Sequence, residues 1–316
     1  MVQLRLPRFR RARDVPAIEL TERDKEALRL VHRHRFLRSS HLVKLLPGSR
    51  QQILRRLQRL FHHGFLERPP AQIEYFGRNG SRAIAYGLGN KGAAWLKHNL
   101  NLPLNRLDWS GRNRSAGRLF LEHALLVSDV MVAIELACRR DGQVRLLTDD
   151  DLPSLDPLRN RHDSLQWRVS INNRTKLGVI PDRVFGLEIR DPNGKPKRAY
   201  FFLEADRGTM PVKRQTLAVS SVYRKMLAYE ATWTQGLHRS RLGLHRFRVL
   251  TVTTTPARAR SMLDACRGLE RGRGLFLFTD AEAIRTHENP LLLGWHCGRG
   301  GSQDSLIDGS SAPTPY

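Results

Sequence analysis

The sequence predicts a mixed α/β protein with two folded parts. Residues 20–100 hold three runs of helical periodicity followed by two strand-like segments around a turn. From Arg118 onward, apolar runs of strand length alternate with helical segments. Hydrophobic residues make up 40% of the 316 residues, so the chain is long and apolar enough to build more than one core.

Three helices are expected at the start of the first folded part. Thr21 is a natural N-cap for the first helix, and Asp24 stands in the capping-box position. A short helix is expected over 39–46, and a third over 49–63, which begins at a serine cap and ends at Gly64. The apolar residues of the third helix form one stripe, which leaves polar residues on its opposite face.

Two strand-like segments, 71–76 and 82–88, follow and are joined by the turn GRNG, before a last helix over 90–100. Three helices and a β-hairpin are the plan of a winged helix–turn–helix domain, predicted here for residues 20–100. Arginine and glutamine on the third helix and the wing can contact phosphates and base edges, although a winged fold can also bind protein. The predicted DNA-binding residues are Gln51, Gln52, Arg55, Arg59, Arg78 and Arg82.

The charge of the chain favours a polyanionic partner. The net charge is +24 with a pI near 11.2, and the first 100 residues, with 21 lysines and arginines against 7 carboxylates, carry +14 of it. Such a field is typical of proteins that bind nucleic acid or an anionic membrane surface. No apolar run approaches the ~20 residues of a membrane span. The N-terminus lacks the apolar core of a signal peptide, and the three cysteines form no C-x-x-C pair. We therefore expect a cytoplasmic protein without a membrane partner.

The remaining boundaries follow from composition. Residues 1–19 are predicted to be a basic flexible arm, either a solvated tail or an arm that reaches into a DNA groove. Residues 101–117 are predicted to be a linker and 118–296 an α/β domain. The Gly/Ser/Pro-rich end, 297–316, is predicted to be disordered.

The α/β domain is predicted to be a sandwich, because its strand-like runs are apolar enough to be covered on both faces. Residues 149–176 are polar and expected to be irregular. Helices are expected over 118–140, over 212–233 and through 261–266, and strands over 143–148, 178–189, 199–206, 247–254 and 274–280.

Carboxylates gather at the end of one predicted strand, in the stretch FFLEADRGT (201–209). Glu204 and Asp206 are two residues apart and would share a face of the strand. Asp182, at the start of the preceding strand, can lie beside them, and Glu122 on the preceding helix could add a fourth carboxylate. Two or three carboxylates are suitable ligands for Mg²⁺ or Mn²⁺, so this cluster is a candidate metal site for cutting a phosphodiester.

The pattern IPD, a turn and then LEAD resembles the PD-(D/E)xK nuclease-like superfamily. Over about residues 20–280 the chain resembles plasmid replication-relaxation proteins, through LTERDKEALRLVHRHRFLRSSHLVKLL, LRRLQRLFHHGFLER, EHALLVSDV, VIPDRVF and FFLEADRGTM. The resemblance implies a DNA-binding protein of a plasmid or other mobile element that acts in replication, DNA relaxation or transfer. Asp206 stands where the nuclease superfamily has lysine, and Lys213 could replace that lysine.

The predicted catalytic residues are Asp182, Glu204, Asp206 and Lys213, and the predicted metal ligands are Asp182, Glu204 and Glu122. Three interpretations stay open: a structural ion-pair cluster in a degenerate nuclease-like domain, metal binding with cleavage, and metal binding without cleavage. The candidate functions are a DNA-binding protein, a Mg²⁺- or Mn²⁺-dependent endonuclease delivered by the winged helix, and, as a further alternative, a transcription regulator. Double-stranded DNA is the expected partner, with other replication or transfer proteins as further partners and a homodimer as the candidate oligomer.

Overall fold

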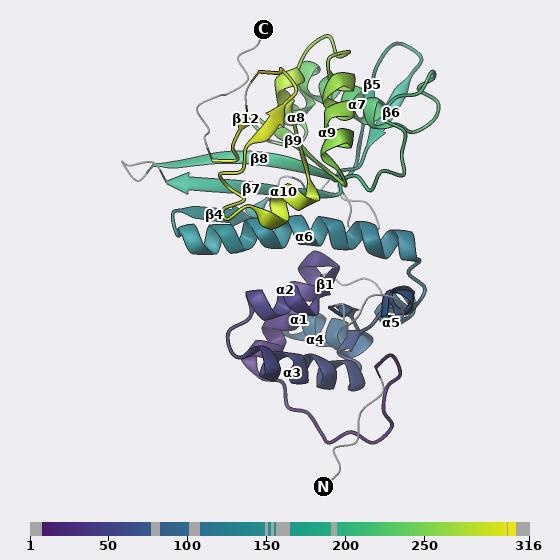
Figure 1. The fold of residues 1–316 in the computed structure, drawn as a ribbon, viewed down its shortest axis with the longest axis vertical. Coiled ribbons are helices and arrows are strands. Elements are labelled where there is room, and N and C mark those ends of the chain that lie inside the picture. Colours follow the sequence, from purple (N-terminus) through teal and green to yellow (C-terminus); the bar gives the residue numbers. More distant parts are fainter. Residues whose placement is uncertain are drawn as a thin grey trace. The chain divides into compact units, whose positions relative to one another are not determined.

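The computed structural model describes residues 8–76, 83–100, 108–148, 151–152, 155, 165–190, 195–301 and 303–307. The chain forms two compact units, residues 1–132 and 133–316, both of which combine helices and sheet, so the predicted mixed α/β class is confirmed (Figure 1). Among the described residues, no helix has the length and apolar character that a membrane span requires.

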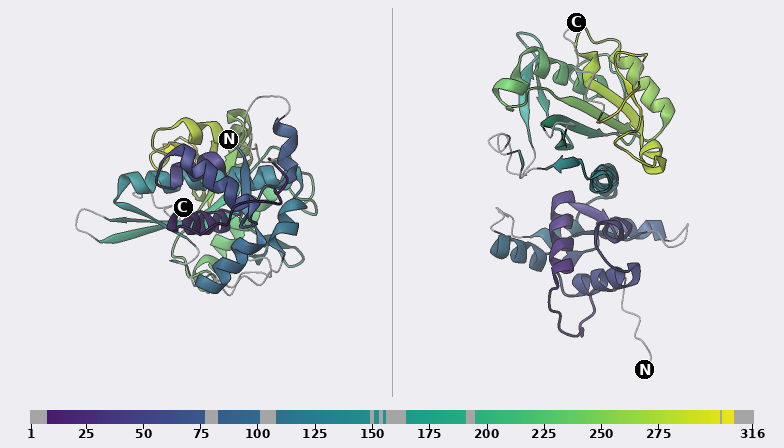
Figure 2. Two further views of the ribbon diagram at one scale, coloured as in Figure 1. Left: turned by 90° about the horizontal axis from the view of Figure 1, so that it is seen from below. Right: turned by 90° about the vertical axis from the view of Figure 1, so that its left-hand side faces the viewer.

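The predicted helices of the first unit are confirmed: α1 (Glu22–His34), α2 (Ser39–Leu45) and α3 (Arg50–His62), which are purple in Figure 1 and Figure 2. Thr21 caps α1 in a capping box with Asp24, because each residue's main-chain N–H binds the other's side chain. Gly64 adopts a left-handed φ of 84° and ends α3, where a side chain with a Cβ would be strained.

A three-stranded antiparallel sheet completes this part of the unit, in the order β1 (Phe36–Arg38), β3 (Ala85–Leu88), β2 (Leu66–Glu67). The prediction of a strand over 71–76 is wrong, because this segment belongs to the 3₁₀ helix η1 (Pro70–Phe76).

The side chain of Gln72 does what a partner strand would do, by bonding both the N–H and the C=O of Ala85 at 2.7 and 2.9 Å. Two consecutive prolines, Pro69 and Pro70, have no N–H to give to a sheet ladder, which explains why the chain does not pair here. The predicted turn at 77–80 lies outside the described residues.

Residues 108–117, predicted as part of a linker, are instead folded into the first unit. After α4 (Asn90–Leu100), the short helix α5 (Trp109–Arg114) is capped by Asp108, which accepts a bond from the Gly111 N–H at 2.7 Å. The fully buried Asn113 donates to the Leu88 carbonyl at 2.6 Å and ties α5 to β3. Composition alone hides this short helix because its contacts are made with a distant strand.

Helix α6 (Arg118–Asp141) was expected to start the second domain, but its residues up to 132 belong to the first unit. Leu121 and Leu125 pack with Phe36 in the core of that unit. The buried Ser128 hydroxyl lies 2.7 Å from the Phe36 carbonyl and 3.1 Å from the His34 carbonyl. The domain boundary therefore falls within the helix, where an apolar run gives no sign of it.

The second unit is built on a seven-stranded mixed sheet in the order β12-β11-β10-β9-β8-β7-β4. The three central strands, β8, β9 and β10, run parallel to each other, and all other neighbours are antiparallel. The strands are β4 (Val144–Leu147), β7 (Arg183–Arg190), β8 (Pro196–Ala205), β9 (Arg248–Thr253), β10 (Phe276–Asp280), β11 (Trp295–Cys297) and β12 (Gln303–Asp304).

The stretch predicted as one strand over 178–189 is two strands in different sheets. Within the described residues, β6 (Lys176–Val179) pairs with β5 (Trp167–Ser170) alone, and β7 begins after Ile180–Pro181–Asp182. The proline removes a main-chain donor and interrupts the ladder at this point. The break leaves Asp182 at the entrance to β7.

Helices α7 (Val222–Thr234) and α9 (Pro256–Cys266) pack on one face of the large sheet (Figure 1). Met226 and Met262 share a core with Phe202 and Phe276. The helix predicted over 212–233 begins only at Val222. The other short helices are α8 (Leu237–Ser240), η4 (Arg273–Leu275) and α10 (Ala281–Thr286).

Part of the predicted disordered tail is instead part of the sheet. β12 pairs with β11, Asp304 accepts a 2.8 Å bond from Arg248, and Leu306 is 3% exposed. The burial of Leu306 and the ion pair between Asp304 and Arg248 hold this polar segment in place. Arg248 lies 56 positions before Asp304, so a local sequence pattern does not reveal the contact. Residues 308–316 lie outside the described part of the chain.

Candidate functional site

The outer face of α3 is basic and polar along its first two turns. Ile53, Leu57 and Leu60 face the core, whereas Gln51, Gln52 and Arg55 are exposed, as predicted. The helix itself has no acidic residue, and the Ser49 hydroxyl caps its first turn by accepting from the Gln52 N–H. This face offers hydrogen-bond donors for phosphates and base edges, and α3 has no carboxylate that would repel the phosphates.

Two further arginines of α3 are used inside the unit. Arg59, predicted to bind DNA, donates to the Ala17 carbonyl at 2.8 Å. Arg56 bonds the buried carboxylate of Asp24 and the Glu19 carbonyl. Burial raises the pKa of the Asp24 carboxyl, but the bonds from Arg56 and Thr21 outweigh it and hold that pKa below its usual range.

Residues 8–19, expected to belong to a flexible arm, lie against α3 and β2, and we call this segment the N-terminal strap. The Arg11 side chain donates to the Phe61 carbonyl at 3.1 Å and to the Glu67 carboxylate at 2.7 Å. The Ala12 N–H donates to His62 Nδ1 at 3.1 Å, and the His63 ring meets the Pro16 carbonyl at 2.9 Å. These partners lie about fifty positions away in the chain, beyond the reach of a local sequence pattern.

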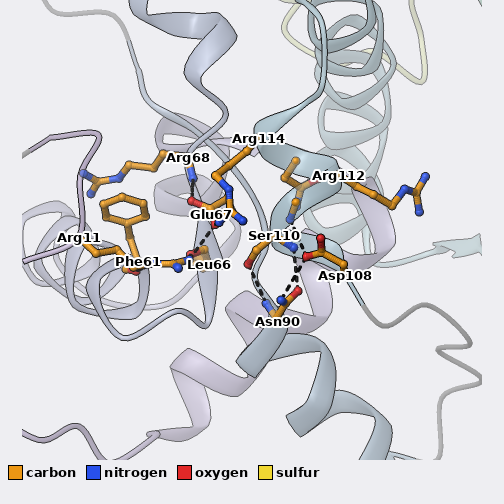
Figure 3. Close-up of polar contacts among 12 residues, drawn as sticks. Arg11, Phe61, Leu66, Glu67, Arg68, Asn90, Asp108, Ser110, Arg112 and Arg114 are labelled. Carbon is orange, nitrogen blue, oxygen red and sulfur yellow. Dashed lines mark hydrogen bonds and ion pairs between the residues drawn. The ribbon is translucent and has the colours of Figure 1, made fainter.

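Arg68 binds the main chain at the start of the strap, at Arg8. It is 4% exposed, its guanidinium lies 4.3 Å from the Phe61 ring centroid, and it donates to the Arg8 carbonyl and to the Tyr86 hydroxyl at 2.5 and 2.9 Å. Figure 3 shows Arg68 and Arg11 on either side of the Phe61 ring, with Glu67 next to them. Cation–π and hydrogen-bond contacts, which are partly buried, therefore hold the strap against the unit. The predicted wing residues Arg78 and Arg82 lie outside the described residues.

Glu204, near the end of β8, is buried and holds two donors from α7. Lys225 Nζ donates to Glu204 Oε2 at 2.5 Å, and the Tyr229 hydroxyl donates to Oε1 at 2.6 Å. Lys225 and Tyr229 stand four residues apart and therefore on one face of the helix. Both oxygens of the carboxylate thus have a partner.

Asp182 lies alongside this group, as predicted. Its N–H donates to the Leu203 carbonyl at 3.1 Å, and its Oδ2 accepts from the Ala205 N–H at 2.8 Å, so it spans the main chain on either side of Glu204. We call Asp182, Glu204, Lys225 and Tyr229 the carboxylate–lysine cluster.

Burial and neighbouring charges both shift the pKa values of the groups in the cluster. Burial raises the pKa of the Glu204 carboxyl, and the charge of Asp182 adds to the rise, while Lys225 and Tyr229 offset only part of it. Burial works against the charge of Lys225, but Glu204 and Asp182 outweigh it and raise the pKa of Lys225 to about 12. Burial likewise raises the pKa of Tyr229, which keeps its hydroxyl a donor.

Asp206 has hydrogen-bond partners of its own, although its charge also helps to raise the pKa of Lys225. Strand β8 ends at Ala205, and Asp206 accepts two bonds from Arg258, at 2.5 and 2.9 Å, and one from the Thr253 hydroxyl at 2.7 Å. Burial raises the pKa of Asp206, but these donors lower it by more than burial raises it, so the pKa lies below its usual value. Asp206, which was predicted to share a strand face with Glu204, lies after the end of the strand and has different hydrogen-bond partners.

The lysine at the carboxylates is Lys225 and not Lys213, which was expected there. Lys213 Nζ lies 5.0 Å from the centroid of the Tyr223 ring. The four-residue spacing of Lys225 and Tyr229 on the helix after the acidic strand is the sequence signal that could have identified the right lysine. Glu122 lies on α6 in the first unit and bonds Arg118 at 2.9 Å.

The carboxylate–lysine cluster can supply some, but not all, of the ligands that Mg²⁺ or Mn²⁺ needs. Within the described ranges, no three His, Cys, Asp or Glu side chains are grouped closely enough to form a metal site. Mg²⁺ usually needs only one or two carboxylates, with water and substrate phosphate as the other ligands, and Asp182 and Glu204 supply two. Glu204 would have to exchange a bond from Lys225 or Tyr229 for the ion.

Comparison with known proteins identifies one family. Residues 28–246, more than half of the chain, match the family model described as replication-relaxation. No curated protein and no solved structure shows significant similarity to the chain.

Proposed function

Because the chain belongs to the replication-relaxation family, we propose that it is a DNA-binding protein that acts in the replication, relaxation or transfer of plasmid or other mobile-element DNA. The observation that carries the proposal is the outer face of α3. Gln51, Gln52 and Arg55 are exposed there on a helix without acidic residues, in a unit with a strong positive charge. Double-stranded DNA is the polyanion that such a helix is suited to contact.

The element order of the first unit supports a winged helix–turn–helix interpretation. Helix α1, strand β1, helices α2 and α3 and then strands β2 and β3 follow one another, with α2 and α3 joined by the short turn Leu46–Ser49. In such domains the helix after the turn enters the major groove and its N-terminal residues meet base edges. In this interpretation Gln51 and Arg55 face the groove.

A second function, metal-dependent cleavage of DNA, is favoured by Lys225. Its ammonium bonds Glu204 with Asp182 alongside, so a lysine and two carboxylates meet at one end of a buried strand. In this proposal Asp182 and Glu204 hold Mg²⁺ or Mn²⁺, and Lys225 holds a water in position by hydrogen bonding. The ion, when bound, would neutralise charge on the phosphate. In this proposal Lys225 takes the role of the lysine of the nuclease superfamily, which was expected at Asp206 or Lys213.

The binding proposal is tested by fluorescence anisotropy with labelled double-stranded DNA. Arg55→Ala and Gln51→Ala should weaken binding at least tenfold together, because each removes a base or phosphate contact of about 1–3 kcal/mol. Lys97→Ala, on α4, is the control and should change affinity little. Unchanged affinity in the double variant would refute the role of α3.

The cleavage proposal is tested with supercoiled plasmid and Mg²⁺ or Mn²⁺. Nicking or cutting that Glu204→Gln and Lys225→Met both abolish, while DNA binding persists, would establish it. Intact plasmid after incubation of the wild-type protein at millimolar metal would leave the cluster as a structural ion pair. The binding proposal does not depend on this outcome.

A further inference from the structure

We infer that the N-terminal strap is a seated second element of the DNA interface, whose Arg10 and Arg13 contact the phosphates that flank the groove entered by α3. The inference rests on the proposed DNA binding by α3 and adds a surface that this helix does not supply. It also decides between the two roles left open for the basic N-terminus, a solvated tail and a DNA-contacting arm.

The position of the strap follows from His62. This residue is seven positions after Arg55 and eleven after Gln51, so helical geometry places all three on the outer face of α3. Gln51 and Arg55 are exposed, but His62 is only 4% exposed, and the Ala12 N–H bonds its ring. The strap therefore crosses the outer face of α3 at the C-terminal end of the helix.

The distance along the helix matches the dimensions of DNA. Seven residues of α-helix separate Arg55 from His62, which is a rise of roughly 10 Å. The major groove of B-DNA is about 12 Å wide. When the first turns of α3 lie in the groove, its C-terminal end and the strap above it lie beside one of the phosphate backbones.

The strap presents cations at this place. Four of the six residues 8–13 are arginine, and Arg10 and Arg13 are exposed and form no ion pair with a carboxylate in the described part of the chain. Arg11, between them, points inward to Glu67 and the Phe61 carbonyl. Because Arg11 fixes the backbone, its neighbours are held at the surface and lose less conformational entropy on binding than the arginines of a free tail.

The first test removes the two exposed charges. Binding of Arg10→Gln/Arg13→Gln to double-stranded DNA is measured over a range of salt concentrations and compared with Lys97→Gln/Arg112→Gln, which removes two exposed charges of the same unit from α4 and α5. We expect weaker binding by the strap variant and a log–log salt slope shallower by about 2, since each lost phosphate contact contributes about 0.9. The control pair should keep the wild-type slope. An unchanged slope in the strap variant, or an equal change in the control, overturns the inference.

The second test separates a seated strap from a charged tail. Glu67→Gln removes the buried partner of Arg11 and makes the protein more positive by one charge. If only the net charge matters, the variant should bind DNA more tightly. If the Arg11–Glu67 ion pair holds the strap in place, the variant should bind DNA more weakly, with a larger entropic cost by calorimetry. Equal or tighter binding of this variant, with circular dichroism showing an intact fold, contradicts the seated strap.

Failure of this inference can be distinguished from failure of the proposed function. If Gln51→Ala/Arg55→Ala weakens binding but Arg10→Gln/Arg13→Gln does not, α3 binds DNA and the strap does not. If the wild-type protein does not bind double-stranded DNA at low salt, both proposals fail.

Discussion

Replacing Lys225 with methionine is the sharpest test of the carboxylate–lysine cluster. The substitution keeps the length and apolar stem of the side chain but removes the ammonium that bonds Glu204 at 2.5 Å. Burial and the charge of Asp182, which already raise the pKa of Glu204, then act with only Tyr229 left to oppose them. The pKa of Glu204 in the folded protein therefore rises further.

The sign of the pH dependence follows from this direction. A carboxyl with a higher pKa in the folded than in the unfolded chain favours folding fully below its unfolded pKa, and this contribution is lost as pH rises through the folded pKa. Wild type and variant should therefore have the most similar free energies of unfolding at the lowest pH, where protonation of Glu204 is most favoured. The difference between them should grow as the pH increases.

The decrease in the free energy of unfolding caused by Lys225→Met should lie between two limits. Removing one partner of a fully buried ion pair costs about 3–5 kcal/mol, and removing one from a surface pair costs about 0–1 kcal/mol. The Glu204 side chain is 8% exposed and that of Lys225 is 42% exposed. We therefore expect a loss of roughly 2 kcal/mol near pH 8.

The assay is urea unfolding at pH 4.5, 6 and 8, followed by circular dichroism. Lys213→Met is the matched control, because this lysine lies over the Tyr223 ring, away from the bonds to Glu204. It should change the free energy of unfolding by less than about 1 kcal/mol at every pH. A loss in Lys225→Met that is equal at all three pH values, or absent at pH 8, would refute the coupling of Lys225 to Glu204.

Three further predictions concern the first unit, each measured by chemical or thermal unfolding. Gln72→Ala should cost about 2 kcal/mol, because the N–H and C=O of the buried Ala85 lose their partners, and a cost near zero would show that water replaces them. Burial lowers the pKa of His62, so the unfolded chain takes up a proton that the folded chain excludes, and stability falls as pH drops below about 6.5. His62→Asn should reduce that fall between pH 7.5 and 5.5; parallel falls would contradict it. Asp24, whose pKa is lowered, stabilises the fold above its unfolded pKa and loses this effect as pH falls through its folded pKa. Asp24→Asn should therefore cost about 3 kcal/mol at pH 7, because it breaks a buried pair with Arg56, and less at pH 3; an equal cost at both values would show that the charge is not responsible.

Local signals explain why much of the fold is predictable from the sequence. Thr21 with Asp24, and Ser49 with Gly64, mark the ends of helices through bonds to nearby main-chain atoms. The apolar runs of β8, β9 and β10 are continuous because these strands are buried on both faces of the sheet.

The errors arise where a distant partner decides the local structure. The side chain of Gln72 replaces a strand, and Asn113 draws a predicted linker into the core. Asp182 could be placed beside Glu204 because β7 and β8 are neighbours in the chain as well as in the sheet. Lys225 was missed because twenty-one residues separate it from Glu204 and the start of α7 is set by the cap at Ser221.

The account rests most on DNA contact by the outer face of α3. Hydrogen–deuterium exchange of the intact protein, with and without double-stranded DNA at low salt, measures this contact directly. We predict slower exchange on DNA binding in peptides from α3 (Arg50–His62) and from the strap (residues 8–19), with little change in α4 (Asn90–Leu100). Protection confined to residues 133–316, with α3 and the strap unchanged, would contradict the account.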